Sequence, residues 1–141
     1  MSSLLFAHLL FLGLWIGCIA TETVFEHTTG KEPGMAATIA RLHVKVDLWV
    51  ETPAFLAVLA TGTMLYLDAA MTPLFAWKIG TAIVAIATNA ACVWIVIARD
   101  GAMRRGQMER AAVLDDWQHK SGALLVLLIA TAITLAVIDR M

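Results

Sequence analysis

Acidic and imidazole side chains recur at helical spacing in the middle of this chain. His43, Asp47 and Glu51 follow one another at intervals of four residues. In a helix this spacing places them along one stripe over about 12 Å of rise. The stripe runs into an apolar segment, where an ionisable group costs about 2.5–3.5 kcal/mol on insertion scales. Ionisable residues inside membrane helices usually serve a function, so we take this stripe as the start of a site.

Two other segments carry the same types of residue. Asp116 and His119 are three residues apart, which places a carboxylate and an imidazole on neighbouring turns of one helix face. Glu22 and Glu26 share a face of an earlier helix, and His27 follows directly. If successive helices alternate in direction, all three groups come to the same end of a bundle.

Carboxylates and imidazoles that converge from several helices are the ligands with which bundles hold metal ions, and the Asp-x-x-His spacing belongs to that pattern. The mixture suits non-haem iron and disfavours a purely soft copper(I) site. We therefore predict a transition-metal site for iron, zinc, manganese or copper. The alternative is a solvated helix end in which these acids pair with nearby arginines and lysines. The candidate metal ligands are Glu22, Glu26, His27, His43, Asp47, Glu51, Asp116 and His119.

The composition indicates which elements must position these residues. Of 141 residues, 60 % are hydrophobic, and the mean hydropathy is +0.80, whereas soluble domains are roughly half apolar. A spanning helix needs about 20 apolar residues, so four spans nearly fill the chain. Pro53 should interrupt the second span beside Glu51, because it lacks a backbone N–H. We expect an all-α integral membrane fold, a single four-helix transmembrane bundle over residues 1–141, with helices at about 4–27, 35–66, 74–98 and 107–138.

Basic residues gather at one end of the expected bundle, where residues 99–106 are predicted to form a basic loop. By the positive-inside rule this end is cytoplasmic and both termini lie outside, in a bacterial inner membrane. The net charge of −1 offers no basic face for phosphates, so no nucleic-acid partner is expected. The other end is flanked by Arg140 alone. The basic residues at the end predicted to be cytoplasmic are Lys31, Arg41, Lys45, Arg99, Arg104, Arg105, Arg110 and Lys120.

Two further ionisable residues are expected at the outer end of the bundle. His8 and Lys78 each lie about one turn inside a span. Taken singly, such a histidine is usually a hydrogen-bonded core residue, and such a lysine extends its ammonium to the interface. Together in one layer they could bind the acidic edge of a cofactor or a metal.

Several positions also resemble a known family. They are His8 with Trp15 seven residues later and Gly17, Thr52-Pro53-Ala54 with Gly62, and Trp77-Lys78. These are similar to positions in the bacterial four-helix membrane protoporphyrinogen oxidases of the haem pathway and in the wider copper-resistance D-like membrane proteins. The resemblance implies b-type haem binding, with His8 as a candidate axial ligand and Lys78 as a functional partner. The stripe of His43, Asp47 and Glu51 lies outside that family pattern.

Three functional hypotheses follow. The first is a membrane metal-binding protein that serves redox chemistry or ion handling. The second is a b-type haem oxidoreductase, with His8 or a pair of His43 and His119 as axial ligands. The third is a non-catalytic accessory subunit, in which the acids and bases form buried pairs. The expected partners are the lipid bilayer, a metal ion or haem, and a second copy or a larger membrane complex. No catalytic residue is assigned, because neither a nucleophile triad nor a phosphate-binding loop is present.

Overall fold

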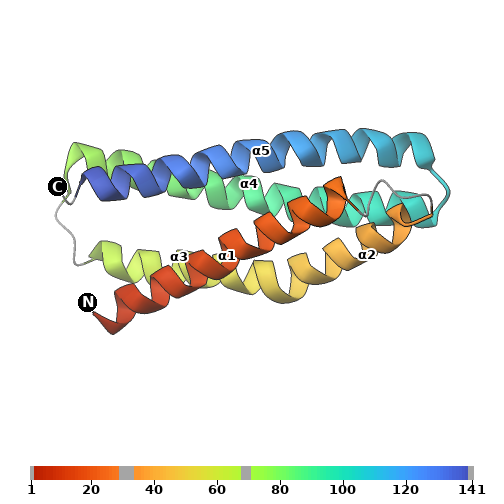
Figure 1. The fold of residues 1–141 in the computed structure, drawn as a ribbon. Coiled ribbons are helices and arrows are strands. Elements are labelled where there is room, and N and C mark those ends of the chain that lie inside the picture. Colours follow the sequence, from red (N-terminus) through yellow and green to blue (C-terminus); the bar gives the residue numbers. More distant parts are fainter. Residues whose placement is uncertain (1, 29–33, 68–70, 140–141) are drawn as a thin grey trace.

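The computed structural model describes residues 2–28, 34–67 and 71–139. The helices are α1 Ser3–His27, α2 Ala36–Val46, α3 Thr52–Leu67, α4 Pro73–Arg104 and α5 Met108–Ile138, and the π-helical turn η2 Asp47–Glu51 joins α2 to α3 (Figure 1). Because α2, η2 and α3 run on as one helix, these described ranges contain four long helices. The prediction of an all-α four-helix bundle is confirmed.

The helices pack as two pairs (Figure 1). α4 and α5 lie side by side in opposite directions, α1 packs against α3, and α2 packs against α4. The start of α1 and the end of α5 lie at one end of the bundle, called here the terminal end. The end of α1, the start of α2, the end of α4 and the start of α5 form the opposite, polar end. The alternating direction of the helices therefore brings the three predicted groups of ligands to the same end.

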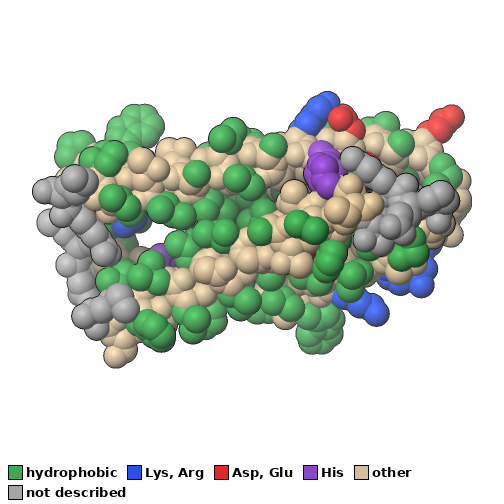
Figure 2. Space-filling model, viewed as in Figure 1, with side chains coloured by type: hydrophobic (Ala, Val, Ile, Leu, Met, Phe, Trp, Pro, Cys, Tyr) green, Lys and Arg blue, Asp and Glu red, His purple; other side chains and the backbone are tan. Residues whose placement is uncertain are grey.

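Many large hydrophobic side chains are exposed on the outer surface, and Figure 2 shows them along the length of one face. Large side chains far from the helix ends point outward, including Trp94 and Leu127, each 65 % exposed. In water this surface would be unfavourable by roughly 25 cal/mol per Å², whereas lipid tails accept it. Each of the four helices is long and apolar enough to cross a membrane. The chain therefore has the features of an integral membrane protein.

The second spanning helix changes its hydrogen-bonding pattern beside Pro53, as predicted. The N–H of Thr52 bonds to the carbonyl of Asp47, five residues earlier, so the turn is wider than an α-helical one. Pro53 follows without an N–H to donate, which explains why the regular ladder is interrupted here. Asp47 and Glu51 are the first and last residues of this turn, and both are buried. π-Helical turns of this kind often occur at functional sites.

The predicted basic loop at 99–106 is wrong, because α4 continues through Arg104. Arg99 and Asp100 are helical and buried, and Arg104 pairs with Asp100 one turn before it. Basic residues in the last turn also stabilise a helix, because they interact favourably with the negative end of its dipole. The true connection to α5 is shorter and contains Gly106, whose φ of 68° suits glycine. Lys31 and Arg140, two of the residues behind the predicted orientation, lie outside the described residues.

The core combines apolar packing with one buried polar contact. Trp15 is 2 % exposed and packs against Phe55, with their ring centroids 6.0 Å apart. Its indole N–H is shared between Asn89 Oδ1 at 3.0 Å and Glu51 Oε1 at 3.2 Å. One side chain thus connects α1 to α4 and to η2 near the centre of the bundle.

We expect Trp15→Phe to destabilise the fold without changing its architecture. The phenyl ring keeps most of the packing but leaves the Glu51 and Asn89 side chains without their donor, at a cost of about 1–3 kcal/mol. Trp94→Phe is the matched control, because it makes the same exchange on the outer surface. Thermal unfolding of the detergent-solubilised proteins by circular dichroism measures the difference. Equal midpoints for both variants would contradict this role of the indole N–H.

Candidate metal centre

His43 is the centre of the polar end. It lies on α2, and its side chain is only 10 % exposed. Its Nδ1 lies 2.8 Å from Glu26 Oε1 on α1 and 3.2 Å from Gln118 Nε2 on α5. Its Nε2 lies 3.3 Å from Glu22 Oε2 and 3.6 Å from Asp47 Oδ1. Side chains from α1, η2 and α5 therefore surround one imidazole.

The two nitrogens of His43 have different neighbours. With its Nδ1–H donated to the Glu26 carboxylate, His43 directs its Nε2 toward Glu22 and Asp47. Ligand atoms of Glu22, His43 and Asp47 all lie within 4.8 Å of one another. For bonds of about 2.0–2.2 Å at a tetrahedral angle, ligand atoms lie roughly 3.3–3.6 Å apart. The two separations at Nε2, 3.3 and 3.6 Å, fall in that range.

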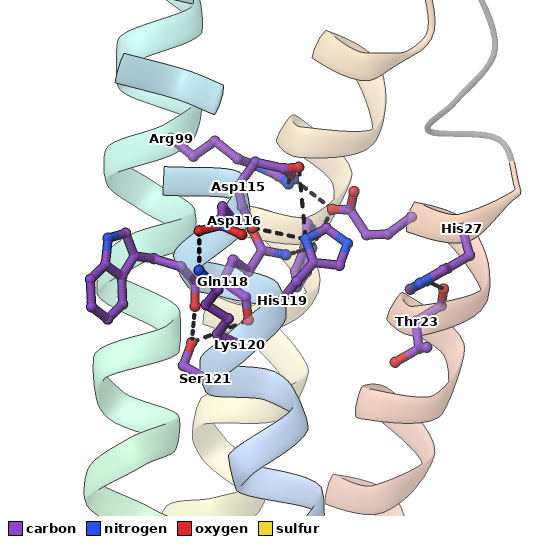
Figure 3. Close-up of polar contacts among 12 residues, drawn as sticks. Thr23, His27, Arg99, Asp115, Asp116, Gln118, His119, Lys120 and Ser121 are labelled. Atoms are coloured by element: carbon purple, nitrogen blue, oxygen red, sulfur yellow. Dashed lines mark hydrogen bonds and ion pairs between the residues drawn. The ribbon is translucent and has the colours of Figure 1, made fainter. Parts of the chain in front are cut away.

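Glu26 is itself held by an arginine. Arg99, 4 % exposed on α4, places one guanidinium nitrogen 2.5 Å from Glu26 Oε1 and the other 2.5 Å from Asp115 Oδ1 on α5. Figure 3 shows Arg99 and Asp115 side by side at this end of the bundle. The guanidinium thus connects three helices and fixes the carboxylate that orients His43.

The remaining buried acids have too little positive charge beside them. Within the described ranges, no salt bridge joins Glu22, Asp47 or Glu51 to a lysine or an arginine. Glu51 lies beside Glu22 and Asp47, and His43 carries at most one positive charge. If all three acids are ionised, at least two negative charges are unbalanced. Glu22 Oε1 is also buried and has no hydrogen-bond partner among the residues that the structure describes. These groups need protons or a cation.

Only some of the predicted metal ligands lie together in the structure. Glu22, Glu26, His43 and Asp47 come together as the sequence predicted, and Glu51 lies next to them. The other three predicted ligands lie outside this cluster on the exposed surface, where Asp116 pairs with Lys120 at 2.6 Å. The prediction that one shell includes His27, Asp116 and His119 does not match these positions.

The reason lies in the orientation of α5. Its buried positions Ala111, Gln118, Leu125 and Ile129 are spaced by seven, seven and four residues, so they share one face. This face directs Gln118 toward His43 and turns Asp116 and His119 away from it. The seven-residue spacing from Ala111 to Leu125 through Gln118 was a signal that could have identified Gln118 from the sequence.

Sequence reasoning also missed Arg99 and Asn89. Arg99 was assigned to a loop, and its pairing across helices has no signal in its local sequence. Asn89 is fully buried in a long apolar helix, and an amide at such a position indicates a hydrogen-bonded partner.

A cavity of about 960 Å³ opens between the helix pairs near the terminal end (Figure 2). His8 and Lys78 both line it, so the predicted pair does share one layer. The Nδ1 of His8 lies 2.9 Å from Thr61 Oγ1, and Lys78 Nζ lies 4.8 Å from the centre of the Phe75 ring. Gly62 leaves room for the imidazole, since a Cβ there would lie 3.2 Å from His8 Cε1. Trp15 also lines the cavity, and its indole N–H donates to Glu51.

No family model, curated protein or solved structure matches the chain in any of three comparisons.

We expect Arg99→Met to destabilise the protein strongly, because it leaves the carboxylates of Glu26 and Asp115 without their partner. Removing one member of a buried pair costs about 3–5 kcal/mol. Lys120→Met is the matched control, since its pair with Asp116 is exposed and contributes little. Denaturant unfolding in detergent compares the two variants with wild type. Similar unfolding midpoints for both variants would show that the ion pairs of Arg99 do not stabilise the polar end.

Proposed function

We propose that this protein is an integral membrane metal-binding protein that holds a divalent transition ion for redox chemistry or ion handling. The ligands are His43 Nε2 and one carboxylate oxygen each from Glu22 and Asp47. The observation that carries the proposal is the orientation of His43. Glu26 accepts its Nδ1–H at 2.8 Å, and Nε2 faces two acids that no arginine or lysine neutralises. Metal-bound histidines almost always donate their other ring N–H to a carboxylate, a backbone carbonyl or water, and Glu26 is such a carboxylate.

Charge favours a divalent cation at this place. Two carboxylate ligands and a neutral imidazole carry two negative charges, which an ion of charge +2 balances. Protons could neutralise the same acids, and a protonated imidazole could donate to Glu22. Glu22 Oε1 is buried and has no hydrogen-bond partner among the described residues, so this oxygen needs either a proton or a cation beside it. A metal ion beside the carboxylate satisfies this atom electrostatically.

The ligand chemistry narrows the choice of ion. One imidazole with two carboxylates suits zinc, iron(II) and manganese(II), and it accepts copper(II) more readily than copper(I). Three protein ligands leave a coordination position for water or a substrate, as in catalytic zinc sites. Glu51 lies beside Glu22 and Asp47 and would be the nearby acid able to hold a proton in such a site. By the positive-inside rule the centre lies toward the cytoplasm, with both termini outside.

A second candidate function uses the cavity at the terminal end. Its volume is at the upper end of the range for ligand pockets, about 300–1,000 Å³. The lining is mostly apolar, with one imidazole from His8, one ammonium from Lys78 and the carboxylate of Asp139. Because Thr61 engages Nδ1 of His8, the Nε2 is available as an axial ligand, and Lys78 suits an acidic cofactor edge. These features support b-type haem binding in a membrane oxidoreductase, as the family resemblance implies.

We expect purified protein to contain about one equivalent of a transition metal, measured by elemental analysis. His43→Ala should remove the metal, because it deletes the imidazole ligand. Glu26→Gln should keep the ligands but weaken binding by about 10–100-fold, the usual effect of losing an orienting carboxylate. Affinity should fall as the pH is lowered, since protons compete for the same ligand atoms. Glu109→Gln, an exposed acid at the start of α5, is the control and should change nothing.

A metal-free wild type that cannot be loaded by dialysis against zinc, iron(II), manganese(II) or copper(II) would rule this function out. Equal metal content in wild type and His43→Ala would place the ion elsewhere. Co-purification with a membrane partner, and without a cofactor, would instead favour the accessory-subunit hypothesis.

The haem candidate predicts a Soret band that shifts on reduction in protein made with haem supplied. His8→Ala should abolish or shift this band, because it removes the axial ligand. His43→Ala should leave the band unchanged, since His43 lies at the other end of the bundle. A colourless wild-type preparation, or a band that is insensitive to His8→Ala, would contradict haem binding at this cavity.

A further inference from the structure

A second pair of imidazoles lies on the surface of the polar end. His27 at the end of α1 and His119 on α5 are both exposed, and their ring centroids are 5.5 Å apart with an interplanar angle of 74°. Figure 3 shows His119 on α5 near Gln118 and Asp115, and His27 on α1 beside Thr23. The buried centre does not use either residue.

Hydrogen bonds fix the chemical state of both rings in the same way. His27 Nδ1 lies 2.9 Å from the carbonyl oxygen of Thr23, and His119 Nδ1 lies 2.8 Å from the carbonyl oxygen of Asp115. A carbonyl only accepts, so each Nδ1 carries the hydrogen. Each neutral ring therefore keeps its lone pair on Nε2. Metal-bound histidines commonly show this arrangement, in which one nitrogen donates to a carbonyl and the other binds the ion.

The spacing of the two rings also suits a shared ion. A metal about 2.0–2.1 Å from a ring nitrogen lies roughly 3.2 Å from the ring centroid. Two such rings at a tetrahedral angle have centroids roughly 5.2 Å apart, and about 6.4 Å apart when they lie on opposite sides of the ion. The observed 5.5 Å falls between these limits. Both side chains are exposed, so an ion can reach the pair from the surface.

Polar contacts connect this pair to the buried centre. His119 Nδ1 lies 3.7 Å from Asp115 Oδ2, and Asp115 binds Arg99. Arg99 binds Glu26, which accepts from His43. Asp115, which lies beside His119, is thus linked through Arg99 to the carboxylate that holds His43, so the surface pair lies close to the buried centre.

The geometry points to a second metal site, formed by His27 and His119, that captures a divalent ion such as Zn²⁺ or Cu²⁺ at the surface before the ion reaches the buried centre. The existence of this surface site is independent of the proposed function. Its role in passing an ion to the buried centre rests on the proposed function. Two imidazoles favour zinc, copper(II) and nickel over magnesium or calcium. With only two protein ligands, the site binds more weakly than the buried centre and exchanges ions more readily.

Titration of metal-free, tag-free protein with Zn²⁺ in detergent tests the site. Wild type should show a tight and a weaker class of binding. His27→Ala/His119→Ala should lose the weaker class alone, and His43→Ala should lose the tight class alone. His8→Ala, which removes a histidine at the terminal end, should retain both. A double variant that titrates like wild type would overturn the proposal and reduce the pair to an aromatic contact.

Electron paramagnetic resonance with Cu²⁺ identifies the ligands directly. In His43→Ala the signal should show coupling to two imidazole nitrogens, and adding His27→Ala should reduce this to one. Absence of two-nitrogen coupling in His43→Ala would overturn the site. The proposed function is contradicted by a different result, namely wild-type protein that shows only the weaker class of Zn²⁺ binding.

Loading of the buried centre is followed by competition with a chromophoric zinc chelator. Loading should be slower in His27→Ala/His119→Ala than in wild type, with the final tight occupancy unchanged. An unchanged rate would overturn the capture role and leave the surface site as a separate binding site.

Discussion

The polar end of this bundle depends on an imbalance of buried charge. Glu22, Asp47 and Glu51 are at most 6 % exposed, and His43 is the only basic group among the described residues that contacts Glu22 and Asp47 directly. Ionised carboxylates this close repel one another, and burial strengthens the repulsion. The arrangement is stable only with added positive charge, either protons or a cation. A metal ion between Nε2 and two carboxylates meets that requirement and makes use of the buried oxygen that lacks a hydrogen-bond partner.

The two ends of the bundle are held together by different forces. At the polar end, Arg99 joins α4 to α1 and α5 through ion pairs. Toward the terminal end the helix pairs meet through apolar contacts, and a cavity of about 960 Å³ separates them. Apolar contacts give little attraction between helices in lipid, because the tails are equally apolar. The polar network therefore fixes the position of the helix pairs at one end, whereas a cavity lies between them at the other.

Each of the four histidines places its Nδ1 near an oxygen atom. The partners are Thr61 Oγ1 for His8, a backbone carbonyl for His27 and for His119, and the Glu26 carboxylate for His43. The partner decides what each imidazole can do, because it decides which nitrogen keeps a lone pair. The fold thus offers Nε2 to a cavity, to a buried acidic cluster and to the surface.

The sequence by itself determined the number of helices, since the length of each apolar segment sets how many times the chain can cross a membrane. It also predicted that the acids and imidazoles of the different helices lie at the same end of the bundle, because their spacing along each helix is local and short connections make successive helices run in opposite directions. Only the tertiary structure decided which face of α5 turns inward. Residues 115, 116, 118, 119 and 120 are all polar, so periodicity there is ambiguous, and packing against α4 places Gln118 inside and His119 outside. Arg99 entered the site for the same reason: its partners lie 16 and 73 residues away, and only folding brings them together.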